Sequence, residues 1–319
     1  MRAQMKPMEL AASIRLVALL GAAFLLSALP AAAQTAADGP FVLVDQLQKV
    51  SPHVQVIPDG SRPLVPNVGF IVGEKAILIV DTGLGARNGR AVAAVAQRLG
   101  GGKQQFLVTT HVHPEHDLGA GGFSAVTKMI RSADQVKAIA ESGMQTADAF
   151  RKMSAVNATL LEGAAFRKAD ITFDKSYDLD LGGLTVQILS VGPNHTLGDT
   201  AVWVKPDGVL FAGDLAMQRG PSIDAKYGKI GYWLATLDRL EALGPKIIVP
   251  SHGPIGDTGL IAGYRMLMID VRDRAVPEKR AGRSLDEATA NVSAAISSKY
   301  PNAARSVAGL VRAAYAEAP

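Results

Sequence analysis

Three of the six histidines in this 319-residue chain fall within six positions. His111 and His113 are two residues apart, and Glu115 and His116 follow shortly after. In an extended segment, side chains two residues apart point to the same side, so His111 and His113 can face one centre. Neutral imidazoles held close together are unfavourable unless something shares their lone pairs, and a divalent metal ion does so. The spacing therefore predicts a metal site.

Three further candidate ligands occur later in the chain, each in a polar loop after an apolar segment: His195, Asp214 and His252. Functional residues commonly occupy such loops on a rigid scaffold, and one rim can gather several of them. These three side chains are therefore candidates for the same site. His53 stands alone, and its isolation indicates an ordinary structural residue.

The elements that must position these side chains alternate between strand-like and helix-like patterns. Expected strands occupy residues 54–57, 68–72, 76–80, 106–110, 179–189 as a hairpin, 200–204, 209–212 and 246–249. Expected helices occupy residues 90–99, 132–142 with Ser132 as N-cap, 146–161, 230–243, 260–276, 285–298 and 303–317. Pro277 and Pro301 are expected to separate the last three helices. The pattern predicts one αβ/βα body with a helical tail.

The composition excludes several kinds of site. The chain has no cysteine, which rules out disulfides, thiolate zinc sites, iron–sulfur clusters and cysteine nucleophiles. Any metal must therefore be held by nitrogen and oxygen atoms.

Residues 1–33 have the pattern of a secretory signal peptide. Three basic residues flank or precede an uncharged apolar run over residues 16–29, which is too short to span a bilayer, and alanines at 31–33 offer a cleavage site. We therefore expect cleavage near Ala33, a periplasmic or secreted protein, and no stable membrane anchor. The leader carries three basic residues and one acidic residue, so its removal lowers the net charge from +4 to +2. A nearly neutral mature chain argues against a nucleic-acid partner.

The segment Thr110-His111-Val112-His113-Pro114-Glu115-His116, with the later His195, Asp214 and His252, resembles the metallo-β-lactamase-fold hydrolase superfamily. Val80-Asp81-Thr82-Gly83 and Phe211-Ala212-Gly213-Asp214 appear in the order the family has them. The resemblance implies an α/β fold, the αβ/βα four-layer sandwich, over residues 34–262, with residues 263–319 as a C-terminal helical extension.

The resemblance also implies roles for the candidate residues. His111, His113 and His195 would hold a first metal; His116, His252 and the carboxylate of Glu115 would hold a second; Asp214 would bridge the two. Asp81 and Asp199 would orient these ligands.

The chain departs from the family at Glu115, where relatives usually have Asp. Its longer side chain can ligate after a small shift of the second metal, or it can leave that site weak, with Asp117 as a neighbouring candidate. The absence of cysteine excludes the lactamase subclass that uses a thiolate at the second metal.

The implied function is that of an exported hydrolase in which a metal-activated water attacks the carbonyl of a small-molecule lactam, lactone, ester or thioester. Asp214 and Glu115 are the catalytic candidates, Glu115 as a general base if it does not bind metal. Zinc suits the ligand set, and iron or manganese also fits. The leader and the helical ending look most like exported members associated with quinoprotein and sulfur-oxidation systems.

Two alternatives remain open on sequence grounds. One is a mononuclear-iron oxidoreductase of the persulfide dioxygenase type, with iron on His111, His195 and Asp214. The other is a non-catalytic exported accessory protein, in which Glu115 marks a degraded second site. The sequence does not predict the substrate or the oligomeric state.

Overall fold

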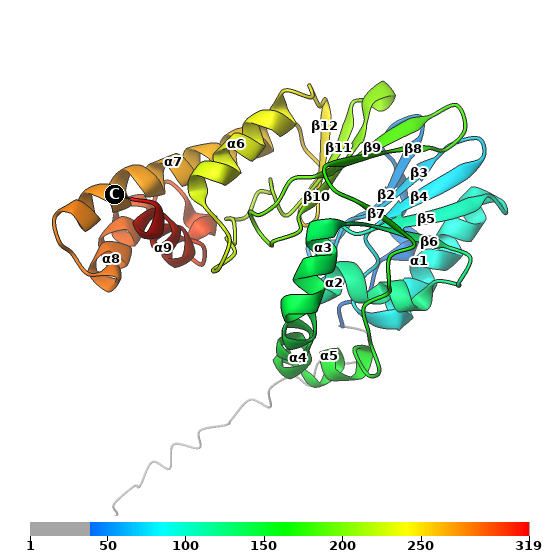
Figure 1. Cartoon of the computed structure of the whole chain (residues 1–319), viewed down its shortest axis with the longest axis horizontal. Helices are drawn as coiled ribbons and strands as arrows, with labels where there is room; N and C mark the ends of the chain where they lie inside the picture. Colours follow the sequence, from blue (N-terminus) through cyan, green and yellow to red (C-terminus); the bar gives the residue numbers. More distant parts are fainter. Residues whose placement is uncertain (1–38, 319) are drawn as a thin grey trace, which may run out of the picture. The chain divides into compact units, whose positions relative to one another are not determined.

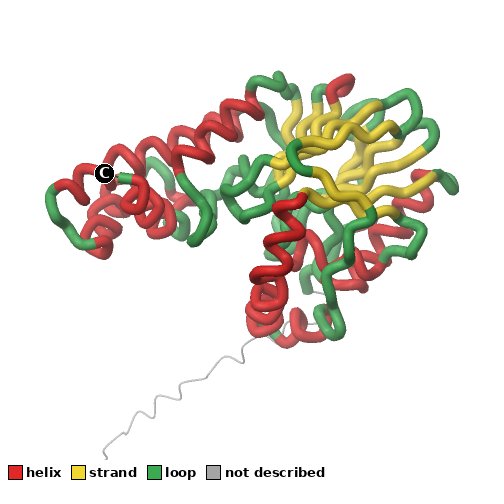
Figure 2. The backbone as a smooth tube through the Cα atoms, in the orientation of Figure 1, coloured by secondary structure: helices red, strands yellow, loops and turns green. Residues whose placement is uncertain are grey.

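The computed structural model describes residues 39–318. The predicted signal peptide, residues 1–33, lies outside this part of the chain, and residues 36–319 belong to one unit. Within the described part, two β-sheets carry helices on their outer faces (Figures 1 and 2). No helix there combines the length and the apolar character needed to cross a membrane.

The first sheet has seven strands within the described residues, arranged in chain order. β1 to β4 pair antiparallel, and β4 to β7 pair parallel. Its strands are β1 (Gln48–Lys49), β2 (Val54–Ile57), β3 (Val68–Val72), β4 (Ala76–Val80), β5 (Gln104–Val108), β6 (Lys128–Ser132) and β7 (Ile171–Phe173). A parallel pair needs a crossover, and α1 (Gly85–Gly100) supplies it between β4 and β5.

The second sheet has five strands in the described chain, in the order β12-β11-β10-β9-β8. These are β8 (Ser176–Asp180), β9 (Thr185–Ser190), β10 (Thr200–Val204), β11 (Val209–Gly213) and β12 (Ile247–Pro250). Only the last step, from β11 to β12, is parallel among these pairs, and α6 (Ile230–Glu241) makes that connection.

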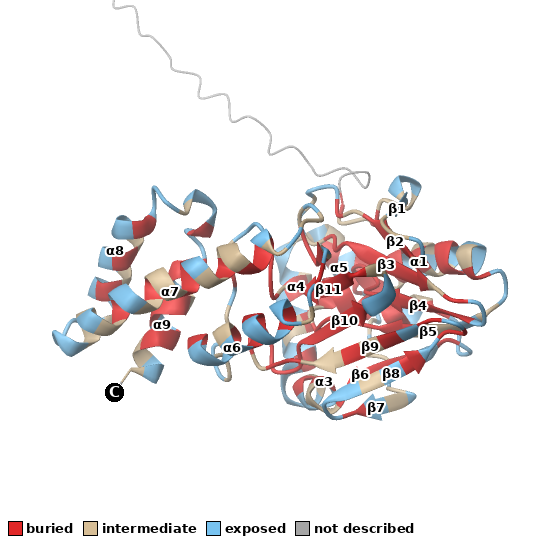
Figure 3. Cartoon of the chain, turned by 90° about the horizontal axis from the view of Figure 1, so that it is seen from above, coloured by how far each residue is buried: buried red, intermediate tan, exposed pale blue. Residues whose placement is uncertain are grey.

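One hydrophobic core cluster lies between the two sheets. Alternate residues of β4 illustrate the division: Leu78 and Val80 pack toward the second sheet, and Ile77 and Ile79 pack toward α1. β4, β10 and β11 are buried along their whole length (Figure 3). A side chain at Gly69 of β3 would collide with the ring of Phe211 from β11, so this glycine permits the close approach of the sheets. The predicted four-layer α/β architecture is confirmed.

The helix η1 (Val44–Gln46) precedes β1. Shorter helices connect later strands of the first sheet: α2 (Pro114–Asp117), η2 (Leu118–Gly122), α3 (Ala133–Ala138), the π-helical η3 (Ile139–Gly143), α4 (Met144–Met153) and α5 (Ala155–Leu160). In the second sheet, η4 (Lys205–Asp207) joins β10 to β11. Ser132 caps α3 by accepting from the Gln135 amide, as predicted. The expected helix over 146–161 is divided, because Ser154 is extended and its hydroxyl caps α5.

The C-terminal region consists of α7 (Gly259–Arg280), α8 (Leu285–Ile296), η5 (Pro301–Ala303) and α9 (Val307–Glu317). Their apolar faces form one cluster with α6 and with residues of β10 and β11, such as Trp203 and Leu210. The prediction that Pro277 ends the helix is wrong, since α7 continues to Arg280 and stops before Gly282, whose φ is +74°. One missing amide so close to the helix end removes a single bond there, and the turn continues. The expected division at residues 262 and 263 falls inside α7 and stays a prediction.

Candidate metal centre

The candidate ligands lie where strands of both sheets end. His111 and His113 follow β5, and Glu115 and His116 lie in α2, whose first turn begins at Pro114. The second sheet contributes three residues, each from a loop that follows a strand: His195 after β9, Asp214 after β11 and His252 after β12. Each sheet therefore supplies part of one cluster.

Three groups of side chains in the described chain place one potential ligand atom each within 4.8 Å of the others. These groups are His111, His113 and His195; His111, His116 and Asp214; and Glu115, His116 and His252. All seven residues named from the sequence thus come together. His53 belongs to none of these groups and pairs instead with Asp207, with Nδ1 2.7 Å from Oδ1.

The first group has the spacing of a metal site. His113 Nδ1 lies 3.1 Å from His111 Nε2 and 3.1 Å from His195 Nε2. A tetrahedral zinc ion with nitrogen ligands at 2.0–2.1 Å would separate those nitrogens by roughly 3.3 Å. The three imidazoles therefore fit one tetrahedral ion with little movement.

The second group is built around His116. Its Nε2 lies 3.7 Å from Glu115 Oε1, and Asp214 lies between the groups, with Oδ2 3.4 Å from His195 Nε2 and Oδ1 4.0 Å from His252 Nε2. The Glu115 carboxylate thus lies beside His116 and His252.

Unpaired polar atoms support the fit of a metal. Among the described residues, His116 Nε2, Glu115 Oε2 and Asp214 Oδ1 are buried without a hydrogen-bond partner. Leaving such atoms unpaired costs about 1–3 kcal/mol each, and more when they are charged. Three of them in one cluster of nitrogen and oxygen donors are what bound divalent ions would satisfy.

Asp81 orients His116 directly, and it holds the Thr110 hydroxyl that lies 3.1 Å from His111 Nδ1. Its backbone is left-handed, with φ of +66°. Oδ1 accepts from the Thr110 amide at 2.7 Å, and Oδ2 lies 2.9 Å from both Thr110 Oγ1 and His116 Nδ1. Because His116 Nδ1 faces a carboxylate, its proton belongs there and Nε2 is left free to bind a metal.

Two other ligands, His195 and His252, are held by backbone carbonyls. His195 Nδ1 lies 2.6 Å from the Ser222 carbonyl, and His252 Nδ1 lies 2.8 Å from the Val65 carbonyl. Asp199 shapes the His195 loop by accepting from three consecutive amides, those of residues 194–196. In each case the nitrogen that faces the cluster is Nε2.

Asp117, the alternative to Glu115, points elsewhere. It forms a buried two-point ion pair with Arg131 of β6, with Oδ1 2.8 Å from Nη2, and Oδ2 accepts from Thr109 Oγ1 at 2.8 Å. Its carboxylate is therefore already used, and Glu115 is the carboxylate that faces His116.

Burial and mutual proximity control the charges of the cluster. Burial, together with the neighbouring histidines, lowers the pKa of His111 and His113 well below the usual value. Burial also lowers the pKa of His252, to about 3. Burial would lower the pKa of His116 as well, but Asp81, with Glu115, raises it to about 9. Neutral histidines are the form that binds metal, so His116 would release its Nε2 proton when a metal binds, whereas His111, His113 and His252 are already neutral near pH 7.

The pKa values of the two carboxylates, Glu115 and Asp214, shift in opposite directions. Burial raises the pKa of Glu115. Burial acts in the same direction on Asp214, but the surrounding histidines, His195 and His252 foremost, hold its pKa well below the usual value. Asp214 is therefore the ionised centre of the cluster.

Sequence reasoning missed several residues that build the site. Asn67 donates to the carbonyls of Pro250 and Gly253, and Asp59 accepts from the Gly253 amide, so both fix the His252 loop. Asp59 and Asn67 lie among turn residues between two short strands, where polar residues are common, so only their distant partners distinguish them.

Comparisons with known proteins identify relatives of this arrangement. A family model described as the Metallo-beta-lactamase superfamily matches residues 61–252. The linear primary-alkylsulfatase of a Pseudomonas strain is 26% identical over 217 residues, which cover 58% of this chain and 40% of that protein. A beta-lactamase-like protein 2 homolog of Caenorhabditis elegans is 24% identical over 84 residues, 26% of this chain and 27% of that protein. The chain therefore spans less than half the length of either curated relative.

Solved structures share the fold. A stereoselective inverting sec-alkylsulfatase from Pseudomonas sp. aligns with a TM-score of 0.69 and 17% identity, over 84% of this chain and 49% of that one. A metallo-beta-lactamase family protein from Thermus thermophilus aligns with a TM-score of 0.58 and 19% identity, over 83% and 93% of the two chains. At these identities the likeness concerns the fold alone.

Proposed function

The chain belongs to the metallo-beta-lactamase superfamily, and on that basis we propose that it is a metal-dependent hydrolase of small-molecule esters or related acyl compounds. The observation that carries the proposal is the cluster of seven converging side chains, three of which present buried atoms without partners. Such a set suits two divalent ions better than it suits a purely structural network, because a structural network pairs its own polar atoms.

We propose zinc as the metal. His111, His113 and His195 would hold the first ion, and Glu115, His116 and His252 the second. Asp214 lies between the two groups and would contact both ions. When bound, such ions polarise the reacting oxygen of the substrate and activate water for attack.

The protein groups would divide the remaining work. Asp214 is ionised and its side chain is 11% exposed, so it can accept a hydrogen bond from the attacking water and orient it. Burial raises the pKa of Glu115, and its Oε2 is unpartnered, so it would be a candidate proton acceptor if it does not bind metal. Asp81 would keep the proton of His116 on Nδ1.

The substrate class is proposed from two sources. The chemistry of the site suits attack on the carbonyl of a lactam, lactone, ester or thioester. The names of two relatives describe alkylsulfatases, which adds alkyl sulfate esters to the candidates.

The test combines metal analysis with a substrate panel. Purified chain is measured for zinc, iron and manganese, then assayed with a lactam, a lactone, a thioester, a carboxylic ester and an alkyl sulfate. We expect about two zinc ions per chain and turnover of at least one substrate, abolished by chelation and by His111→Ala. A chain that binds no metal would overturn the proposal.

The same experiment separates the alternatives. About one iron and no zinc, with oxygen consumption on a persulfide, would support the oxidoreductase. Bound metal without turnover of any substrate would support an accessory role. The position of Glu115 in the cluster, 3.7 Å from His116 Nε2, argues against a degraded second site.

We further propose that the protein is exported, with its leader cleaved near Ala33, and that residues 34–262 and 263–319 are the catalytic domain and a helical extension. Amino-terminal sequencing of the protein from a periplasmic or secreted fraction should begin near Gln34. An intact Met1 in the cytoplasmic fraction would contradict export. The association with quinoprotein and sulfur-oxidation systems stays a prediction.

A further inference from the structure

A cavity of about 600 Å³ lies beside α7. Its walls come from three segments: residues 217–220, residues 256–267 at the beginning of α7, and residues 299–303 around η5. Small-molecule sites typically have volumes of about 300–1,000 Å³, so this cavity is large enough for a ligand. None of the seven candidate metal ligands lines it.

Two loops that carry candidate metal ligands nevertheless continue into the wall of the cavity. Met217 in its wall follows Asp214 by three residues, and Gly256 follows His252 by four. The charge of Arg219, which also lines the cavity, contributes to lowering the pKa of His252. The loops that present two of the ligands therefore continue directly into this wall.

The face of α7 that borders the cavity lacks a side chain at Gly263. Leu260, Gly263 and Leu267 follow the spacing of a single helix face and all line the cavity. A Cβ added at Gly263 would have no atom within 4 Å, so open space lies next to the backbone. Glycine within a helix costs about 1 kcal/mol relative to alanine, and here it leaves room that a side chain would fill. Met217 and Met266 extend the apolar part of this wall, whose polar part includes Arg219, Asp257 and Lys299.

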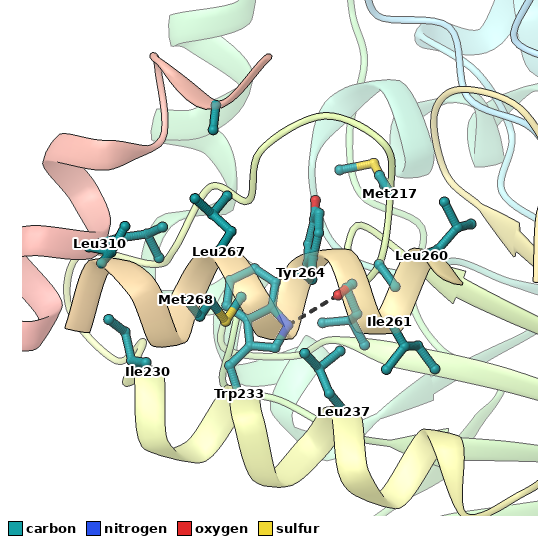
Figure 4. Packing of buried hydrophobic residues seen from close by; sticks show 14 of the residues in the cluster. Met217, Ile230, Trp233, Leu237, Leu260, Ile261, Tyr264, Leu267, Met268 and Leu310 are labelled. Carbon is teal, nitrogen blue, oxygen red and sulfur yellow. Dashed lines mark hydrogen bonds between the residues drawn. The ribbon is translucent and has the colours of Figure 1, made fainter. Parts of the chain in front are cut away.

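Tyr264 supplies a polar group at this wall. The residue is 2% exposed, and its hydroxyl is buried without a hydrogen-bond partner in the described chain. Its ring packs edge-on against Trp233, with centroids 6.0 Å apart, and Trp233 Nε1 donates to the Leu215 carbonyl at 3.2 Å. Figure 4 shows the hydroxyl pointing away from Trp233.

The phenol is thus fixed in position with an unused donor. Burial, with a contribution from Asp214, raises the pKa of Tyr264 well above the usual value, so the proton stays in place. An unpaired buried hydroxyl is unfavourable, and a ligand that accepts its hydrogen bond would remove that cost.

We propose that this cavity binds the apolar chain of an ester substrate, and that the Tyr264 hydroxyl donates a hydrogen bond to the polar linkage of that substrate. The proposal rests on the hydrolase function above and names its substrate class. The apolar chain lies along the Gly263 face of α7, and the ester group lies toward Asp214 and the metal ligands.

The first test fills the cavity. Gly263→Leu places a side chain in the open space, and Gly263→Ala is the matched control. Each buried methylene should improve KM of the wild type about fourfold in a series of acyl esters or alkyl sulfates of two to ten carbons. Gly263→Leu should lose this dependence, whereas Gly263→Ala should keep it. The series is measured once with carboxylic esters and once with sulfate esters. The series whose KM depends on chain length identifies the ester linkage of the substrate.

The second test measures binding without turnover. Decanoate and decyl sulfate, below their micellar concentrations, are titrated calorimetrically into metal-free protein. Tyr264→Phe should weaken binding of at least one of them about tenfold, and Tyr315→Phe, which removes a hydroxyl outside the cavity, should leave it unchanged. Thermal unfolding confirms that each variant is folded.

The outcomes separate this proposal from the hydrolase function. Chain-dependent binding that Gly263→Leu abolishes, in a protein that hydrolyses nothing, would uphold the cavity as a binding site and refute the function. Hydrolysis with the same KM for two and ten carbons, unchanged in Gly263→Leu, would refute the cavity and leave the function standing.

Discussion

Replacing Asp81 with asparagine should weaken the second metal site selectively. Asparagine has the same shape but carries one acceptor oxygen. If that oxygen keeps the bond to the Thr110 amide, the new amide nitrogen faces His116 Nδ1. His116 must then accept at Nδ1, which moves its proton to Nε2, the atom that faces Glu115. A protonated Nε2 cannot bind a metal.

The size of the effect follows from the bond that is lost. The contact between Asp81 Oδ2 and His116 Nδ1 spans 2.9 Å, and both side chains are at most 1% exposed. Hydrogen bonds to charged groups contribute about 1.5–3 kcal/mol, or a factor of roughly 10 to 150 in an equilibrium constant. Replacing a group that orients a metal-bound histidine typically costs 10- to 100-fold in affinity. We therefore expect zinc to bind the second site about 10- to 100-fold more weakly.

The assay is a calorimetric zinc titration of metal-free protein in the presence of a competing chelator. Asp81→Asn should retain the first binding step within about threefold and lose affinity in the second. Asp178→Asn, which makes the same change of charge at an exposed position, should alter neither. Equal affinities in all three proteins would refute the reasoning. Equal weakening of both steps would show that Asp81 acts through Thr110 and the general fold instead of through the proton of His116.

Three further predictions test other parts of the structure. Glu115→Gln should reduce bound zinc to about one ion per chain. Asp117→Asn should retain two zinc ions and lower the denaturant midpoint, because breaking a buried ion pair costs about 3–5 kcal/mol. The reverse pattern would make Asp117 the ligand. Gly69→Val should shift urea unfolding by more than about 1 kcal/mol, since the added methyls meet the ring of Phe211, and an unchanged midpoint would contradict the close approach of the sheets. In metal-free protein the imidazole of His252 should stay neutral down to about pH 3 when followed by NMR. Because the folded-state pKa lies below the unfolded value, this histidine should destabilise the metal-free chain as the pH falls below about 6.5; a midpoint near 6.5 would contradict the burial argument.

The sequence predicts the site well where ligands follow clear strands. His111, His195 and His252 each come after an apolar run, and strands of this kind end at a common rim. The resemblance supplied their pairing into two groups, and the structure brings the same residues together.

The choice between Glu115 and Asp117 depended on local structure that the sequence left ambiguous. Pro114 begins a short helix, in which residues two apart point in directions about 200° apart. Since Glu115 faces the cluster, Asp117 faces away, toward Arg131. That arginine also explains why strand β6 was missed, because a charge within a short apolar segment obscures its pattern.

Tyr264 and its cavity could not be predicted from the sequence. Helical periodicity indicates only that Tyr264 lies on an apolar face, and tyrosine on such a face usually pairs its hydroxyl with a neighbour. Whether that partner is present depends on the loop at residues 217–220 and on η5, which are distant in the sequence from α7.

The division of the ligands between the sheets has a mechanical consequence. The first sheet is formed from residues 48–173 and the second from residues 176–250, and each proposed ion takes ligands from both. Bound metal would therefore act as a cross-link that joins two consecutive halves of the chain at one edge of their shared core. A cross-link that closes so long a loop lowers the conformational entropy of the unfolded chain, as a disulfide does. In a protein without cysteine, the metal centre would be the reactive site and also the cross-link that fixes the two sheets relative to each other.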